Sequence, residues 1–288
     1  MGWFEAIVLG LVQGLTEFLP ISSSAHLRIV GDLAGWDDPG AAFTAVSQIG
    51  TETAVLIYFR RDIARIIVAW LRSLRGLGWL GARAGAGRHA SPQRDPDPDA
   101  RIGWLIILGT IPIGILGYTF RDTITGPLRD LRIVASMLIL LGIVLAIADR
   151  LGSRDRELTQ LTPRHGVAIG FSQALALIPG VSRSGATTSA ALFLGYTRAE
   201  AARYAFLLAV PAVLTSGVFE AFDIGSEADT AWPQTIVGTL VAGIVGYIVI
   251  AFFMRYISTH TFTPFVVYRI ALGTLVFALL ITGTLSPN

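Results

Sequence analysis

The chain has 288 residues, of which 53% are hydrophobic and only 15% are charged, and its net charge is +2. The absence of cysteine excludes disulfides and thiolate metal sites. Apolar runs this long and numerous exclude a soluble core, so the composition predicts an all-α polytopic membrane protein. We therefore expect contacts with membrane lipids and no nucleic-acid partner.

The first polar feature lies inside an apolar stretch near the N-terminus. Gln13 and Glu17 are four residues apart, so they share one face of a predicted helix. Pro20 ends that helix because it cannot donate the next backbone hydrogen bond. The apolar pieces 2–18 and 24–34 are each shorter than the ~20 residues that a span requires. They predict a re-entrant pair of helices with a break between them.

Three serines follow the proline and offer hydroxyls to the start of the second helix. Ser22 and Ser24 flank Ser23, and Ser23 and His26 are three residues apart on one helix face. The free N–H groups at such a helix start form a site for anions. The break is therefore predicted to bring a carboxylate, a histidine and hydroxyls together.

Six longer apolar runs are predicted to cross the membrane: residues 40–59, 102–120, 133–149, 204–220, 236–254 and 264–284. Residues 60–101 contain nine arginines, so the positive-inside rule predicts a cytoplasmic Arg-rich loop. Residues 221–235 contain no arginine and are predicted to lie outside. The turn 121–132 is also placed outside, although its three arginines argue against that side.

A second break lies between the short apolar pieces 165–178 and 185–195, which predict a second re-entrant pair. Arg183 supplies a permanent charge and a fork that matches phosphate oxygens. Gly180 and Gly185 are predicted to let the backbone approach a ligand. The hydroxyls of this segment are expected to bind the same ligand; they belong to Ser182, Ser184, Thr187 and Thr188.

The two breaks are related by a shift of 160 residues without gaps. The shift superposes six residues, Gly10, Gln13, Leu15, Ser22, Ser24 and Gly35, on Gly170, Gln173, Leu175, Ser182, Ser184 and Gly195. Within a single membrane domain of residues 1–288 we expect one repeat at about 1–149 and another at about 165–288. Because the repeats start on opposite sides, the fold is predicted to be an inverted-topology repeat with six transmembrane helices and two re-entrant pairs.

The stretch Gln13-Gly-Leu-Thr-Glu-Phe-Leu-Pro-Ile-Ser-Ser-Ser-Ala-His26 resembles the [E/Q]-x-x-x-E and serine–histidine motif of the undecaprenyl-diphosphatases. These integral-membrane enzymes are also known as bacitracin-resistance proteins. Pro179-Gly-Val-Ser-Arg-Ser-Gly185 is similar to their second signature, and the resemblance covers nearly the whole chain.

The resemblance implies hydrolysis of undecaprenyl diphosphate to the monophosphate, which recycles the lipid carrier of cell-wall synthesis. It implies a divalent cation, Mg²⁺ or Ca²⁺, and an active site facing the outer side of the bacterial inner membrane. A homodimer is compatible with it. The implied catalytic residues are Glu17, Ser23, His26 and Arg183. Glu17 and Gln13 are expected near the metal, and the residues expected to bind substrate are Gln13, Ser22, Ser24, Gly180, Ser182, Ser184, Gly185 and Thr188.

Two alternatives stay open at this point. His26 could deprotonate either Ser23 or a water molecule, and the residues do not choose between these nucleophiles. A transporter or flippase of polyprenyl phosphate could use the same broken helices. The pairing of Ser23 with His26 favours the enzyme, because carrying a phosphate needs neither a base nor a nucleophile. Glu52 has no role that the resemblance assigns.

Overall fold

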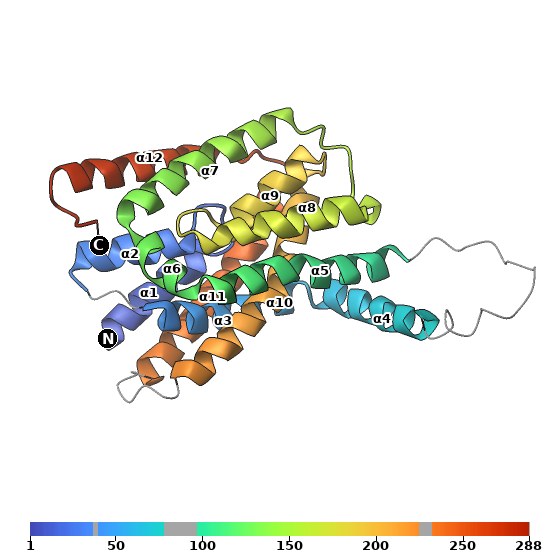
Figure 1. Cartoon of the computed structure of the whole chain (residues 1–288), viewed down its shortest axis with the longest axis horizontal. Coiled ribbons are helices and arrows are strands. Elements are labelled where there is room, and N and C mark those ends of the chain that lie inside the picture. The colour runs from blue at the N-terminus through green and yellow to red at the C-terminus, as the bar shows by residue number, and fades with distance from the viewer. Residues whose placement is uncertain (37–39, 78–96, 225–231, 288) are drawn as a thin grey trace, which may run out of the picture.

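The computed structural model describes residues 1–36, 40–77, 97–224 and 232–287. Over these ranges the chain is helical, apart from short connections and one isolated bridge between Arg156 and Tyr196. Figure 1 shows the helices in chain order. They are α1 (Trp3–Thr16), α2 (Ser23–Ala34), α3 (Gly40–Tyr58), α4 (Arg60–Leu77), α5 (Pro98–Thr119), α6 (Arg121–Thr125), η2 (Pro127–Arg129), α7 (Leu131–Leu151), η3 (Leu158–Gln160), α8 (Pro163–Ala174), η4 (Leu175–Leu177), α9 (Arg183–Phe193), α10 (Arg198–Ile224), α11 (Trp232–Ile257) and α12 (Thr263–Ile281).

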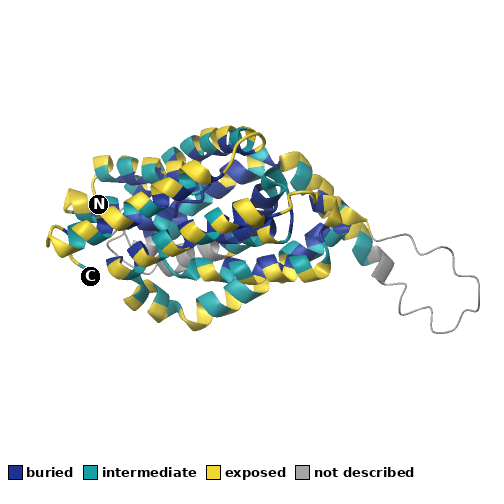
Figure 2. Cartoon of the chain, turned by 90° about the horizontal axis from the view of Figure 1, so that it is seen from above, coloured by how far each residue is buried: buried dark blue, intermediate teal, exposed yellow. Residues whose placement is uncertain are grey.

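Four of the described helices, α5, α7, α11 and α12, are long and apolar enough to cross a membrane. Their outward faces carry exposed large apolar side chains such as Ile115, Ile244 and Phe252. Figure 2 shows exposed residues along the outside of the helices and buried ones between them. A soluble protein would cover such surface, so these faces suit lipid. The prediction of a polytopic all-α membrane protein is confirmed.

The other two expected spans, on α3 and α10, stay predictions. The middle of α3 is polar, because Ser47, Gln48, Thr51 and Glu52 follow each other within two turns. Polar side chains of this kind inside a membrane protein face the interior or a cavity. The helix order also agrees with two short broken pairs, α1–α2 and α8–α9, but their re-entrant character stays a prediction.

The backbone at the two breaks has the same unusual geometry. Ser22 has φ 73° and ψ 98°, and Ser182 has φ 70° and ψ 115°. The hydroxyl of each serine forms a hydrogen bond with the hydroxyl of the serine two residues later. The Oγ–Oγ distance is 3.2 Å for Ser22–Ser24 and 3.1 Å for Ser182–Ser184. A serine at positive φ costs about 1–3 kcal/mol and is kept only where the surroundings enforce it. The same strained backbone conformation therefore occurs at two positions 160 residues apart, as expected for an internal repeat.

The helices of the two expected repeats exchange partners. Helix α1 of the first half packs on α11 of the second, and α8 of the second half packs on α5 of the first. Glycines permit both close approaches: Gly10 lies against the backbone of Gly238, and Gly170 against that of Gly109. This reciprocal packing places the two breaks next to each other in the middle of the molecule. The repeat boundaries and the inverted orientation stay predictions.

The expected loop 60–101 does not begin as a loop. Its first part forms α4, which packs on α5 and buries Ile66 and Ala69. Counting arginines missed the apolar residues at helical spacing that define this face. Ile67 and Leu71 remain exposed beside the arginines of the same helix, as in a helix at a membrane surface. Residues 78–96 of the expected loop, and 225–231 of the expected outside loop, lie outside the described part of the chain.

Candidate active site

Glu17 is the centre of the site and links the two breaks. It follows the last turn of α1, and its carboxylate is almost fully buried. Its Oε1 accepts a hydrogen bond from Nη2 of Arg183 at 2.7 Å. Its Oε2 accepts hydrogen bonds from Oγ of Ser23 at 2.6 Å and from Nε2 of Gln13 at 2.8 Å. Three donors from three separate segments thus converge on one carboxylate.

The breaks fix where these side chains point. Ser23 opens α2 and Arg183 opens α9, so both stand at helix starts directly after a strained serine. Ser182 also caps α9, because its hydroxyl accepts from the backbone N–H of Gly185 at 3.2 Å. Ser184 reaches across to the first break and donates to the carbonyl of Leu19 at 3.3 Å. The two helix starts are therefore joined by side-chain and backbone bonds.

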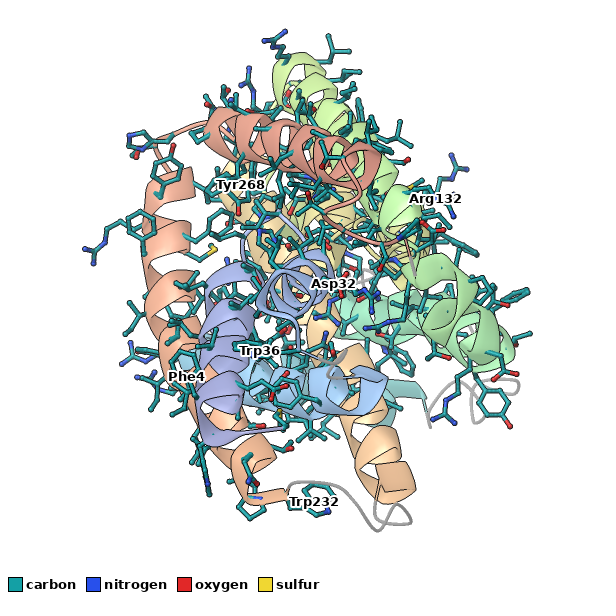
Figure 3. The ribbon with its side chains drawn as sticks, turned by 90° about the vertical axis from the view of Figure 1, so that its left-hand side faces the viewer. Phe4, Asp32, Trp36, Arg132, Trp232 and Tyr268 are labelled. Carbon is teal, nitrogen blue, oxygen red and sulfur yellow. The ribbon has the colours of Figure 1, made fainter. Side chains whose placement is uncertain are left out.

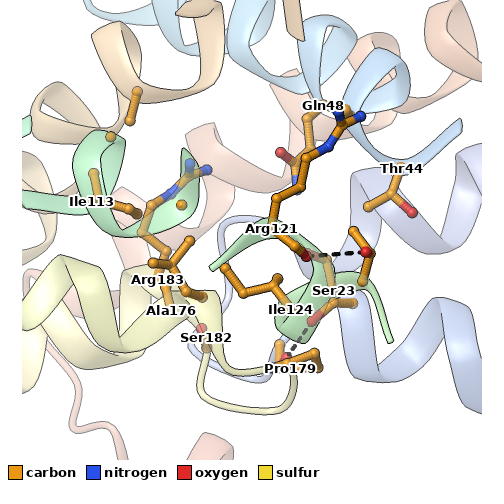
Figure 4. A pocket seen from close by; sticks show the side chains of 18 of the residues that line it. Ser23, Thr44, Gln48, Ile113, Arg121, Ile124, Ala176, Pro179, Ser182 and Arg183 are labelled. Carbon is orange, nitrogen blue, oxygen red and sulfur yellow. Dashed lines mark hydrogen bonds between the residues drawn. The ribbon is translucent and has the colours of Figure 1, made fainter. Parts of the chain in front are cut away.

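A cavity of about 480 Å³ lies in front of these residues. Glu17, Ser23 and Arg183 line one part of it, as Figure 4 shows for Ser23 and Arg183. Of the flanking serines, Ser22, Ser24 and Ser182 line it too, whereas Ser184 does not. Thr44 and Gln48 of α3 line another part. The apolar lining comes from Ile113, Ile124, Ala176, Leu177 and Pro179, among others. The cavity thus has polar side chains at one end, which we call its floor, and apolar side chains along its walls.

Two further arginines line this cavity, and sequence reasoning missed both. Arg121 of α6 and Arg129 of η2 belong to the turn 121–132. Figure 4 shows Arg121 beside the same cavity as Gln48 and Ser23. The clue was present in the sequence, because arginines in a turn placed outside contradicted the positive-inside rule. Their presence is explained by the cavity rather than by topology.

The turn is held at its far end by Asp130. Its carboxylate accepts from the backbone N–H and the guanidinium of Arg132 at the start of α7. The Arg132 guanidinium holds the pKa of this carboxyl below its usual range. Asp130 therefore stays ionised as the N-cap of α7 and fixes the turn that carries the two cavity arginines.

His26 does not take the position that the motif predicts. Its Nδ1 lies 2.7 Å from the carbonyl oxygen of Ser22, to which it can only donate. Its Nε2 lies 2.7 Å from the hydroxyl of Tyr268 on α12, and the two rings are stacked. Figure 3 labels Tyr268 on α12. Both ring nitrogens are thus engaged, and His26 is not among the residues that line the cavity. The expected bond from His26 to Ser23 is replaced by the bond from Ser23 to Glu17.

Other predicted residues are close by but face protein. Gln13 and Thr188 are buried behind the cavity lining. Gly180, at φ 93°, lies against the backbone of Val134 on α7, so its missing side chain admits α7. Gly185 lies against the guanidinium of Arg269. Both glycines thus make room for neighbouring protein atoms, and their approach to a ligand stays a prediction.

Arg269 on α12 is the largest fully buried side chain in the described part of the chain. It donates to the carbonyl of Pro20 in the first break at 2.8 Å. It also donates to the carbonyls of Gly180 and Val181 in the second break at 2.8 and 3.1 Å. Further bonds reach the carbonyls of Met137 and Leu138 on α7. Irregular backbone at membrane depth needs such donors, so Arg269 ties both breaks into one frame.

The residues fit a divalent cation only in part. Within the described ranges there is no group of three His, Asp or Glu residues that could hold a metal. However, Mg²⁺ is often bound by one or two carboxylates together with substrate phosphates. The buried Oε1 atoms of Gln13 and Glu52 have no hydrogen-bond partner in this structure. Two buried oxygens without donors, one of them on the glutamine that bonds Glu17, are consistent with a cation that arrives with a phosphorylated substrate.

The charges of the cavity suit an anion with a long apolar tail. Three arginines, Arg121, Arg129 and Arg183, line it, against a single acidic residue, Glu17. Guanidinium groups bind phosphate through paired hydrogen bonds, and the apolar walls suit a hydrocarbon chain. The hydroxyl of Ser23 points at a carboxylate that can accept its proton. The site is thus built for phosphoryl chemistry on a lipid.

Comparison with known proteins agrees with this interpretation. The family model described as bacitracin resistance protein BacA matches residues 6–275. Undecaprenyl-diphosphatase 2 of Frankia casuarinae is 58% identical, over 100% of this chain and 98% of that protein. Undecaprenyl-diphosphatase 2 of Streptomyces avermitilis is 56% identical over the same shares. Undecaprenyl-diphosphatase of Thermobifida fusca is 55% identical, over 100% of this chain and 94% of that protein.

Proposed function

The chain belongs to the family of the bacitracin resistance protein BacA, and from this premise we propose that it hydrolyses undecaprenyl diphosphate to undecaprenyl phosphate and inorganic phosphate. The observation that carries the proposal is the chain of bonds from Arg183 through Glu17 to Ser23 at the floor of the cavity. The reaction recycles the lipid carrier of cell-wall synthesis and accounts for bacitracin resistance. A flippase would need the arginines but not the bond between Ser23 and Glu17.

The substrate enters with its diphosphate on the arginines. Arg183 binds the transferring phosphoryl group. Arg121 and Arg129, the arginines of the turn, bind the other phosphate and attract the diphosphate into the cavity. The free N–H groups at the start of α9 add to this attraction. The isoprenoid chain lies along the apolar wall near Ile113 and Leu177 and leaves toward the lipid. This orientation puts the terminal phosphorus near Ser23.

Glu17 is the group that accepts the proton of the nucleophile. In one route the Ser23 oxygen attacks the terminal phosphorus, its proton passes to Glu17, and undecaprenyl phosphate departs as the P–O bond of the anhydride breaks. Water then cleaves the phosphoserine and releases inorganic phosphate. In the other route water attacks directly, and Ser23 and Glu17 position it. The short bond from Ser23 to Glu17 favours the first route.

His26 acts as a positioning residue in this scheme. It holds the carbonyl of Ser22, and therefore the start of α2, through a bond that Tyr268 fixes from the other side. The bond to the carbonyl sets the tautomer of the ring. Loss of His26 would thus disturb Ser23 through the backbone.

Glu17 and Gln13 are the residues of the first motif that would hold a divalent cation: Gln13 through its unpartnered Oε1, and Glu17 through a carboxylate oxygen that would exchange one of its present donors for the cation. When bound, Mg²⁺ or Ca²⁺ neutralises charge on the diphosphate oxygens and makes the departing phosphate a better leaving group. The arginines that line the cavity contribute to the same neutralisation.

The protein is a multi-pass membrane protein, and we place it in the bacterial inner membrane with the cavity open to the outer side. The arginine-rich region 60–101 is then cytoplasmic. The short turn that carries Arg121 and Arg129 lies at the opposite end of α5, which fits a cavity open to the outside.

Phosphate release from undecaprenyl diphosphate by the purified full chain tests the proposed function. We expect turnover that EDTA abolishes and that Mg²⁺ or Ca²⁺ restores. Glu17→Gln, purified in parallel, keeps the shape of the side chain but not its charge, and should lose about 10²–10⁴-fold in kcat, the usual contribution of a proton-accepting group. Equal phosphate release by Glu17→Gln and the parent would refute the assignment.

A further inference from the structure

Glu52 is a buried carboxylate that the proposed mechanism leaves without a task. It lies on α3 and is 1% exposed. No donor in the described part of the chain reaches its Oε1 atom. Burying a carboxylate is unfavourable unless a hydrogen bond, a proton or a cation compensates for the lost water. A buried glutamate kept under these conditions calls for a function.

The position of Glu52 connects it to the cavity. Thr44, Gln48 and Glu52 are spaced four residues apart on α3, so they form one row along a single helix face. Thr44 and Gln48 line the cavity, and Glu52 continues the row one turn deeper. The opposite face of α3 packs on α11, where Gly50 lies against Thr239. The side of α3 that carries Glu52 is therefore the side that faces the site.

The charged groups that act on Glu52 are those of the site itself. They are the guanidinium of Arg183 and the carboxylate of Glu17. Arg183 already donates to Glu17 at 2.7 Å, so its charge is shared by two carboxylates. Glu52 therefore has no guanidinium of its own among the groups that act on it. A divalent cation would supply the missing positive charge and would use the free oxygens.

Gln13 adds a second buried oxygen without a donor, next to Glu17. Its Nε2 donates to Glu17, while its Oε1 has no partner and the residue is 0% exposed. Amide and carboxylate oxygens are the ligands that Mg²⁺ and Ca²⁺ prefer. Gln13 contributes no charge, so the first motif alone offers one carboxylate. Glu52 brings the number to two.

We propose that Glu52 is a ligand of the divalent cation and supplies, from α3, the second carboxylate that position 13 lacks in this chain. Glu17 and Glu52 would be the charged ligands, the amide oxygen of Gln13 would be a neutral ligand, and the diphosphate oxygens would supply the remaining ones. The inference rests on the proposed function for the identity of those oxygens. It deepens that function by naming a metal ligand outside both motifs.

Mn²⁺ binding to the detergent-purified full chain tests this without any turnover. Free Mn²⁺ is counted by its electron paramagnetic resonance spectrum, and Mg²⁺ or Ca²⁺ is added as competitor. Glu52→Gln should weaken Mn²⁺ binding at least tenfold, since even residues that only support a metal ligand cost about 10–100-fold. Glu157→Gln, which changes an exposed glutamate far from the cavity, should bind as the parent does.

Moving the carboxylate gives the sharper test. The double variant Gln13→Glu/Glu52→Gln keeps two carboxylates and should recover Mn²⁺ affinity, and with it phosphate release. Recovery would also show that Glu52→Gln had not simply misfolded. Unchanged Mn²⁺ affinity in Glu52→Gln would overturn the proposal, as would a double variant that binds no better than Glu52→Gln while eluting as a folded protein. If the parent binds Mn²⁺ but releases no phosphate, the proposed function fails and the metal site stands.

Discussion

The two helix breaks share one backbone and carry different chemistry. Ser22 and Ser182 have nearly the same φ, and each pairs its hydroxyl with a serine two residues on. The residue between the serines differs: it is Ser23 in the first break and Arg183 in the second. One frame therefore presents a nucleophilic hydroxyl on one side and a phosphate-binding cation on the other.

The comparison teaches that the backbone of the breaks, which we call the frame, is supported separately from the reactive side chains of Ser23 and Arg183. The carbonyls of both breaks are bound by the same residue, Arg269, so the frame has a common support. The side chains of Ser23 and Arg183 meet at Glu17, which accepts a hydrogen bond from Ser23 on one carboxylate oxygen and from Arg183 on the other. Substitutions at the middle positions should therefore affect turnover, and substitutions at the flanking serines should affect stability.

The largest difference is expected at Ser23. Ser23→Ala removes the hydroxyl that donates to Glu17 and should lower kcat by about 10³-fold or more if Ser23 is the nucleophile, as loss of one member of a catalytic unit does. Rapid-quench kinetics with ³²P-labelled substrate measures the step and traps any phosphoserine. Ser172→Ala, which removes a hydroxyl bonded only to its own helix, serves as control. A Ser23→Ala protein that keeps a substantial rate, with no trapped phosphoserine in the parent, would mean that water attacks.

A smaller loss is expected at the matching position of the second break. Arg183→Lys keeps the charge but loses the fork that bonds both Glu17 and a phosphate oxygen, so kcat/KM should fall by about 10²–10³-fold, the loss typical of one transition-state donor. Steady-state phosphate release measures it. Arg203→Lys, whose guanidinium bonds Asp62 and Glu200 away from the cavity, is the matched control. Parental turnover in Arg183→Lys would show that charge alone matters there.

The smallest effects are expected at the two strained serines. Ser22→Gly and Ser182→Gly remove backbone strain together with one hydroxyl, so each should stay within about 1 kcal/mol of the parent. Ser22→Ala and Ser182→Ala keep the strain and lose the hydroxyl. Ser22→Ala should cost about 1 kcal/mol, and Ser182→Ala about 1–2 kcal/mol, because only Ser182 caps its helix. Thermal unfolding in detergent compares the four variants. Equal costs of the two alanine variants would show that the cap of α9 adds nothing to stability.

Much of this site could be predicted from the sequence because it is local. Glu17, Ser23 and Arg183 stand in short motifs beside helix-breaking residues, and the structure brings all three together. His26 shows the limit of that reasoning. Spacing of three placed it near Ser23 on one face, but its ring turns to Tyr268, which is 242 residues away in the sequence. A partner so distant leaves no pattern in a local motif.

The residues that sequence reasoning missed come from other segments for the same reason. Arg121 and Arg129 stood in a turn that was interpreted only for topology. Glu52 was noticed in a predicted span, but no role could be assigned to it. Arg269 lies in an apolar run and has no neighbouring carboxylate to mark it. Only the packing of α3, α12 and the turn that contains α6 and η2 brings these residues near the breaks. The helix α4 was missed for another reason. Its arginines predicted a loop, and the apolar residues at helical spacing on its other face were not considered.

The five backbone bonds of Arg269 set an order of events during biogenesis. The carbonyls that it binds belong to residues 20, 137, 138, 180 and 181, all of which are synthesised before α12. Until α12 enters the membrane, these groups lack the donors that they have in the folded protein, and exposed carbonyls in lipid are costly. We therefore expect the breaks of the newly made protein to stay loosely held until Arg269 arrives. Because one late helix delivers the donors of both breaks, the active site should form together with the last step of folding.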